Sequence, residues 1–232
     1  NKAIAVTDTM DESASVGITG KSGSTVVTGT TFPTGFFSDN TDYCIKEDGN
    51  GGLKLSRDAT ISGKLLVKAG SAELAYGKKT YDGETVVFDD VIVKAGGNTV
   101  EGATYTYTWQ EKLANGTYNT LTSLTGPTGP LDAGDYKLTV AATKNSEELA
   151  SATWTFTIEK AKLTVTFDVE DKVYDGTTNA TLKIKDVIGI SGNSEFTISM
   201  WNEKFADANV GKDITVTANL KITGDASKNY TV

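Results

Sequence analysis

Apolar and polar residues alternate with a period of two along most of this chain. In the stretch TYTYTWQ, the aromatic residues Tyr105, Tyr107 and Trp109 alternate with threonines. Successive side chains of a β-strand point to opposite faces, so this stretch predicts a half-buried strand with its rings toward the core. The same alternation recurs in YKLTVAA at 136–142 and in ATWTFTIEK at 152–160. Three such strands joined by turns favour an antiparallel β-sandwich.

The alternation resumes in the last third of the chain. It is clear in four stretches, KLTVTFDVE at 162–170, ATLKIKDV at 180–187, FTISMW at 196–201 and DITVTANLKI at 213–222. The connecting segment IEKAKL at 158–163 contains neither glycine nor proline. We therefore expect a short, stiff passage between two β-units.

The first third of the chain gives weaker signals. The stretch DYCIKEDGNGGLKLS at 42–56 predicts a hairpin, with Tyr43 and Ile45 before the turn and Leu53 and Leu55 after it. GKLLVKAG at 63–70 predicts a further strand. We assign residues 1–73 to a small β-rich domain of unknown type.

One motif is written twice, 93 residues apart. Lys-x-Tyr-Asp-Gly-x-Thr occupies 79–85 and again 172–178, which gives the matched sets Tyr81, Asp82, Gly83 and Tyr174, Asp175, Gly176. A structural interpretation buries each tyrosine near a strand end and makes a tight turn of Asp-Gly, in which glycine supplies a positive φ. The alternative is a ligand loop presented once per unit. We favour the structural interpretation, because a turn within a diverged repeat needs no ligand.

The stretch DAGDYKL at 132–138 carries a second motif. Asp132, Gly134 and Tyr136 resemble the run on immunoglobulin strand F, in which the tyrosine hydroxyl bonds back to upstream backbone. Leu138 stands where that family has its disulfide cysteine, so the resemblance implies the tyrosine corner without the bridge. Trp109, in an earlier aromatic strand, suits the buried tryptophan of that fold.

The repeated motif, together with FADANVGKDITV and ITGDASKNYTV, resembles the bacterial YDG and MBG repeats. The resemblance covers residues 171–232 well and 76–160 more loosely, and it does not reach 1–73. It implies tandem all-β, Ig-like modules of large surface proteins and adhesins. We expect Ig-like β-sandwiches at 74–160 and 161–232. In that family another strand follows NYTV, so we expect the second sandwich to be truncated at Val232.

The amino-acid composition excludes several kinds of catalytic and metal-binding site. The 232 residues include no histidine and one cysteine, Cys44, and the net charge is −8. Without histidine, neither a Ser-His-Asp triad nor a Cys-His pair can form, and zinc has too few ligands. Neighbouring carboxylates such as Asp89 and Asp90 would point to opposite faces of a strand, away from the paired geometry of a glycosidase. We expect no enzyme, no cofactor, no metal site and no nucleic-acid partner.

The expected function is structural. The chain would serve as a spacer in a bacterial cell-surface or secreted protein, outside the cell and without membrane insertion, supporting adhesion. The alternatives are a module that binds a glycan or a host or extracellular-matrix protein, and an accessory region of a large glycan-degrading enzyme. We expect any ligand contacts at Phe36, Phe37 and Trp201. A Lys172–Asn229 isopeptide crosslink is a further, less favoured chemistry.

Overall fold

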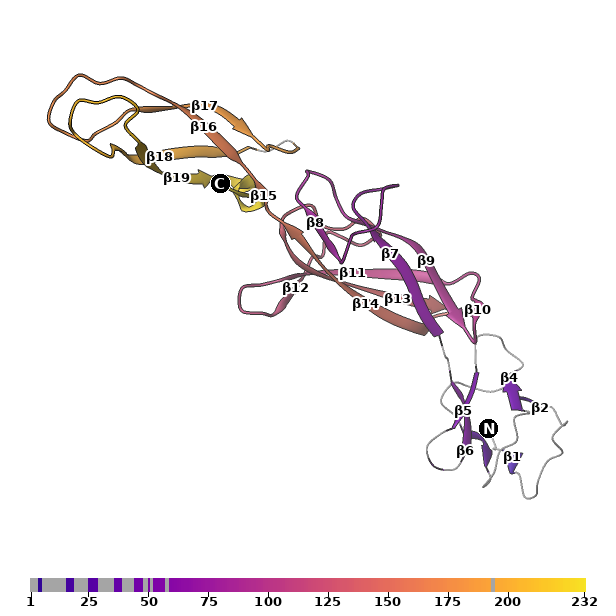
Figure 1. Cartoon of the computed structure of the whole chain (residues 1–232). Helices are drawn as coiled ribbons and strands as arrows, with labels where there is room; N and C mark the ends of the chain where they lie inside the picture. Colours follow the sequence, from indigo (N-terminus) through magenta and orange to yellow (C-terminus); the bar gives the residue numbers. More distant parts are fainter. Residues whose placement is uncertain are drawn as a thin grey trace.

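The structure is a computed structural model, and Figure 1 shows the whole chain. It describes residues 59–192 and 195–232, residue 50 and short segments at 4–5, 16–18, 25–28, 36–38, 44–47 and 52–56. Within these residues the regular structure consists of β-strands and one short 3₁₀ helix, and there is no α-helix. The all-β prediction is confirmed.

The N-terminal strands form two small sheets. β1 (Ile4–Ala5), β3 (Thr25–Thr28), β6 (Gly52–Ser56) and β5 (Cys44–Glu47) are neighbours in that order, and β2 (Val16–Ile18) pairs with β4 (Phe36–Ser38). β5 and β6 are antiparallel, with Glu47 opposite Leu53. The hairpin predicted at 42–56 is therefore confirmed. Leu53 and Leu55 are buried.

Two sheets make up the central unit. The first has the order β10 (Asn98–Thr99), β9 (Val87–Ala95), β7 (Ala59–Leu66). The second has the order β12 (Tyr118–Thr120), β11 (Thr104–Lys112), β13 (Gly134–Lys144), β14 (Glu147–Glu159), β8 (Lys78–Thr80). The three strands predicted from the alternating pattern are the centre of this second sheet.

The two central sheets share one apolar core. Phe88 from β9 lies with its ring centroid 4.5 Å from that of Trp154 on β14. Trp109 and Leu138, which are paired across β11 and β13, are both completely buried in the same cluster. Burial of large apolar side chains from both sheets is the main stabilising contribution to this unit.

The central unit begins earlier than residue 74. Strand β7 pairs with β9 from Ala59 opposite Ala95 to Leu66 opposite Val87. Leu65 belongs to the same core cluster as Trp109. Residues 59–73, which the pattern assigned to the N-terminal domain, are thus part of the central sheet system. The reason is that β7 pairs with β9, which follows it in the chain only after β8, and a local pattern does not reveal such a pairing.

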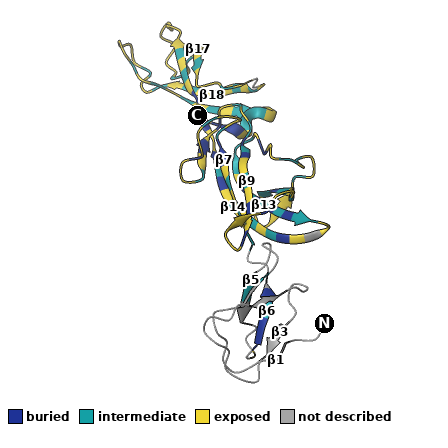
Figure 2. Cartoon of the chain, turned by 90° about the vertical axis from the view of Figure 1, so that its right-hand side faces the viewer, coloured by how far each residue is buried: buried dark blue, intermediate teal, exposed yellow. Residues whose placement is uncertain are grey.

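The C-terminal unit is built from pairs of strands. β15 (Ala161–Lys162) pairs with β20 (Tyr230–Thr231), β16 (Thr164–Val169) with β17 (Leu182–Ile188), and β18 (Thr197–Phe205) with β19 (Val216–Thr223). The 3₁₀ helix η1 (Asp225–Asn229) precedes β20. In Figure 2 the buried positions gather in the central unit, whereas the hairpins of the C-terminal unit are mainly exposed or half-buried.

Candidate functional site

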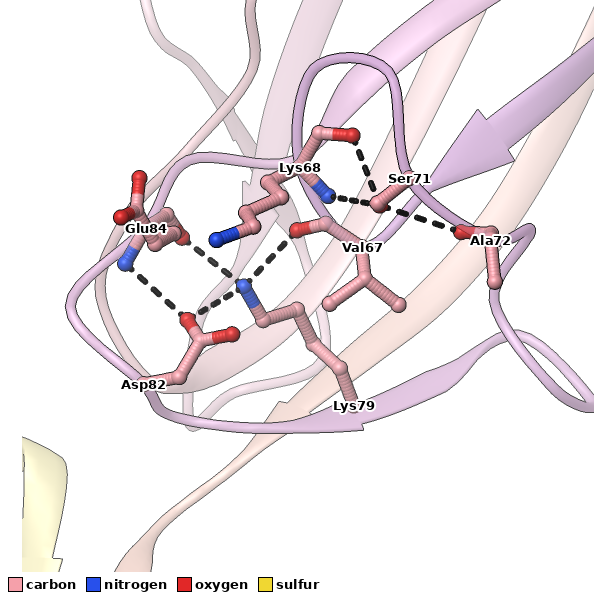
Figure 3. A network of polar contacts seen from close by, with 7 residues as sticks. All are labelled: Val67, Lys68, Ser71, Ala72, Lys79, Asp82 and Glu84. Atoms are coloured by element: carbon pink, nitrogen blue, oxygen red, sulfur yellow. Dashed lines mark hydrogen bonds and ion pairs between the residues drawn. The ribbon is translucent and has the colours of Figure 1, made fainter.

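The first copy of the repeated motif is a turn held by a buried lysine (Figure 3). The side chain of Lys79 is 3% exposed, and its ammonium donates to Asp82 Oδ1 at 2.7 Å. It also donates to the backbone carbonyls of Val67 at 3.0 Å and Glu84 at 2.8 Å. Asp82 Oδ1 in turn accepts the backbone N–H of Glu84 at 3.0 Å. The lysine thereby donates to three oxygens, one carboxylate and two backbone carbonyls.

The second copy repeats this arrangement. Lys172 Nζ lies 2.8 Å from Asp175 Oδ1 and donates to the carbonyls of Thr177 at 2.9 Å and Asn179 at 3.0 Å. Asp175 Oδ1 accepts the backbone N–H of Thr177 at 2.8 Å. The hydrogen bond from Lys172, together with those from Thr177, lowers the pKa of the Asp175 carboxyl to about 2. The shared lysine explains why the motif begins three residues before the aspartate.

The surroundings of the two turns differ. Tyr81 is 6% exposed and packs edge-on against Tyr230 of the C-terminal unit, with ring centroids 5.4 Å apart. Tyr174 is 62% exposed, so the predicted burial of this second ring is wrong. The glycines of the two turns also differ in how closely other atoms approach them. A Cβ on Gly83 would lie 2.7 Å from Gly192 Cα, whereas a Cβ on Gly176 would meet no atom within 4 Å.

The first turn therefore lies at a junction between the central and C-terminal units, which also has a polar part. Asn229 Oδ1 accepts the backbone N–H of Ala133 at 2.7 Å, and its Nδ2 donates to Asp132 Oδ1 at 2.9 Å. Lys228 Nζ lies 2.8 Å from Asp132 Oδ2. Burial alone would raise the pKa of the Asp132 carboxyl, but the hydrogen bonds from Lys228 and Asn229 hold it below its ordinary value.

The apolar side of the junction is continuous with the central core. Leu163 and Tyr230, both buried, belong to the same cluster as Tyr81, Phe156 and Ile158. The hydroxyl of Tyr230 donates to the carbonyl of Ser191 and accepts the N–H of the same residue. These contacts fix the loop that carries Gly192 against the first turn. Figure 1 shows the central and C-terminal units lying end to end.

The residues of the strand F motif lie beside this junction. The hydroxyl of Tyr136 donates to the carbonyl of Asp132 at 2.8 Å, and burial raises the pKa of that hydroxyl. A Cβ on Gly134 would lie 3.0 Å from the Tyr136 hydroxyl oxygen, so the glycine makes room for the ring. Trp109 donates its indole N–H to the carbonyl of Gly126 at 2.9 Å. The tyrosine thus orients the loop whose aspartate meets the next unit.

Of the three residues expected to contact a ligand, the structure describes the side chain of one, Trp201. Trp201, on β18, is 43% exposed. The side chains of Phe36 and Phe37 lie outside the part of the chain that the structure describes. The C-terminal unit does contain an open groove of about 920 Å³, whose apolar lining includes Phe167, Leu182 and Leu220. Trp201 is not part of that lining.

The crosslink chemistry is not supported by the geometry. Lys172 bonds within its own turn, and Asn229 bonds to Asp132 and Ala133 of the central unit. Among the described residues there is no cluster of three or more metal-ligating side chains. None of the described segments forms a helix that is long and apolar enough to cross a membrane.

Sequence reasoning missed the residues that receive the first turn. Asn229 and Tyr230 lie in the stretch ITGDASKNYTV that supports the family resemblance, but neither they nor Gly192 were predicted to contact the central unit, because that role depends on residues distant in sequence. The role of Lys79 was also missed, although a signal existed. Both copies of the motif place a lysine three residues before the aspartate, at the spacing of the observed ion pairs.

Comparison with known families identifies one part of the chain. Residues 159–232 match the YDG domain, so a YDG domain is found in the C-terminal unit. No curated protein and no solved structure matches the chain.

Proposed function

We propose that this chain is a structural spacer, a segment that holds one part of a larger surface protein at a distance from another. The observation that supports this proposal most directly is the junction between the two units. A segment that only linked two independent modules would need no buried contacts across the joint. Here Tyr81, Gly83 and Asp132 of the central unit all contact the C-terminal unit.

The kind of module and its location are further parts of the proposal. We infer Ig-like sandwiches because two sheets share a core and because Tyr136 and Trp109 occupy the places of the tyrosine corner and the buried tryptophan. A bacterial cell-surface or secreted parent protein with a role in adhesion is inferred from the YDG domain and the repeated motif.

The proposal is tested by asking whether the two units move as one body. Backbone ¹⁵N relaxation of the full chain should fit one rotational diffusion tensor for residues 59–160 and 161–232 together. In the Asn229→Ala variant, the Ala133 N–H and Asp132 Oδ1 lose their bonds to Asn229, although Lys228 still pairs with Asp132 Oδ2, and we expect the two sets of residues to tumble more independently. Independent tumbling in the unaltered chain would contradict the spacer, because a loose joint does not hold a distance.

A further inference from the structure

Tyr76 combines an unfavourable backbone with a fully solvated side chain. Its φ is 53°, a region that bulky residues avoid, and the ring is fully exposed at 101%. Gly77 follows with φ 67°, and the N–H of Lys78 donates to the carbonyl of Ala75 at 3.0 Å. Two successive positive φ values in a closed turn favour Asn-Gly or Gly-Gly. Tyrosine at this position carries strain that no contact of its ring offsets.

The turn that carries Tyr76 is fixed to the central sheet. The N–H of Thr157 donates to the carbonyl of Gly77 at 2.9 Å, and β8 continues in parallel with β14 from Lys78 opposite Thr157. A Cβ on Gly77 would lie 3.1 Å from the Thr155 carbonyl oxygen, so the turn approaches the strand closely. The exposed ring therefore stands at one edge of the five-stranded sheet in a defined place.

A second exposed tyrosine lies at the opposite edge of this sheet. Tyr118 on β12 is paired with Lys112 of β11, and Lys137 Nζ lies 4.3 Å from the centre of its ring. The alternation of β11 and β13 turns Trp109 and Leu138 toward the core, so Lys112 and Lys137 are on the outer face. Tyr118 shares this face because it is opposite Lys112.

Between the two rings the outer face is hollowed. A shallow, open depression of about 360 Å³ touches all five strands of the sheet or their ends. Tyr76 and Tyr118 both contribute to its lining, and its polar groups come from Lys78, Lys112, Asp135, Thr155 and Thr157. The Thr157 hydroxyl donates to Asp135 Oδ1 at 2.7 Å, which leaves the oxygen lone pairs of both groups able to accept further bonds.

We propose that this depression is a binding site for a neutral oligosaccharide, with Tyr76 and Tyr118 as its stacking platforms. The apolar faces of pyranose rings pack against flat aromatic side chains, and their hydroxyls need donors and acceptors between those platforms. Lys112 supplies a donor and Asp135 supplies an acceptor. The chain has a net charge of −8, which disfavours polyanionic saccharides. The strained Tyr76 is explained if the ring serves a ligand.

The test uses the full chain, labelled with ¹⁵N and titrated with cellohexaose and chitohexaose, with hyaluronan hexasaccharide as the acidic comparison. We expect saturable shifts of the amides of residues 76–78, 118, 135 and 155–157 with at least one neutral probe. Stacking contacts of this kind are worth about a three- to tenfold change in affinity each, so Tyr76→Asn and Tyr118→Ser should each weaken binding by that factor.

Tyr76→Asn also separates a binding role from a structural one. Asparagine tolerates a positive φ better than tyrosine, so the variant should be at least as stable to urea as the unaltered chain while it binds less. Tyr174→Ser, which removes an exposed tyrosine of the other unit, is the matched control and should leave binding unchanged. Absence of shifts at probe concentrations up to about 10 mM, or full binding by Tyr76→Asn, would overturn the proposal. Tighter binding of hyaluronan than of both neutral probes would overturn the neutral ligand class.

Discussion

At the scale of single residues, the most informative comparison is between the two lysines of the repeated turn. Lys79 and Lys172 make equivalent ion pairs with Asp82 and Asp175. The side chain of Lys79 is 3% exposed, however, and that of Lys172 is 23% exposed. Water can replace the hydrogen bonds of a lost lysine only where it can reach their acceptors. The lysine of the motif therefore contributes more to the free energy of unfolding in the central unit than in the C-terminal unit.

Replacing Lys79 with methionine should destabilise the central unit. The variant leaves the carbonyls of Val67 and Glu84 without the lysine donor and removes the ion pair of Asp82, whose Oδ1 keeps the Glu84 N–H, at a cost of about 2 kcal/mol or more. Urea unfolding measures the loss. Lys172→Met is the matched control and should cost less. An equal loss of unfolding free energy in the two variants would show that burial does not determine how much this lysine stabilises the protein.

The second turn should respond to acid. Because the folded pKa of Asp175 is about 2, below the ordinary Asp value of 3.8, its contribution to stability is complete above the unfolded value and declines as the pH falls from about 4 to 2. A carboxyl ¹³C titration of the full chain measures the Asp175 pKa directly. In Lys172→Met the largest cause of the shift is gone, and this pKa should rise toward 3.8. An unchanged value would assign the shift to the Thr177 bonds instead.

At the scale of elements, the two units differ in how completely their strands are paired. The central unit has sheets of three and five strands, whereas the described strands of the C-terminal unit pair only two by two. Among its described apolar residues only Ala161, Leu163 and Tyr230 are buried, and all three lie near the junction. Val173 and Val210 of this unit are largely exposed. Less buried apolar area means less stabilisation.

We therefore expect the C-terminal unit to unfold first. Trp109 and Trp154 report on the central core and Trp201 on β18, so tryptophan fluorescence separates the two units. In a urea titration, the transition of Trp201 should precede that of the other two tryptophans. The Trp201→Phe variant isolates the central signal and serves as the reference. A single coincident transition in both proteins would instead mean that the junction couples the two units into one cooperative body.

Many strands and the short hairpin at 42–56 could be predicted from sequence, but pairings between strands distant in sequence could not. Alternation marks Tyr105 to Trp109 as a strand because the period of two is a local property. Pairing of β7 with β9 and of β8 with β14 depends on residues distant in sequence, so the start of the central unit was placed too late. Tyr81 and Tyr174 stand in the same local motif, and only the neighbouring unit decides which ring is buried.

At the scale of the whole molecule, the junction depends on a close approach of two backbones. Gly83 and Gly192 face each other, and both have a positive φ, at 80° and 64°. A Cβ on either glycine would lie 3.0 Å or less from the Cα of the other. Backbone cannot move aside as a flexible side chain can, so any substitution at these positions must shift one unit against the other.

Gly83→Ala should therefore open the junction, and Gly176→Ala gives the matched control. Both substitutions place alanine at a positive φ, 80° and 73°, and both should lose about 1–2 kcal/mol through backbone strain. Only at Gly83 does the added carbon meet another unit, at 2.7 Å from Gly192 Cα. The distribution of interatomic distances from small-angle X-ray scattering of the full chain should broaden for Gly83→Ala and stay unchanged for Gly176→Ala. Equal profiles for the two variants would mean that the close approach of Gly83 to Gly192 does not set the angle between the units.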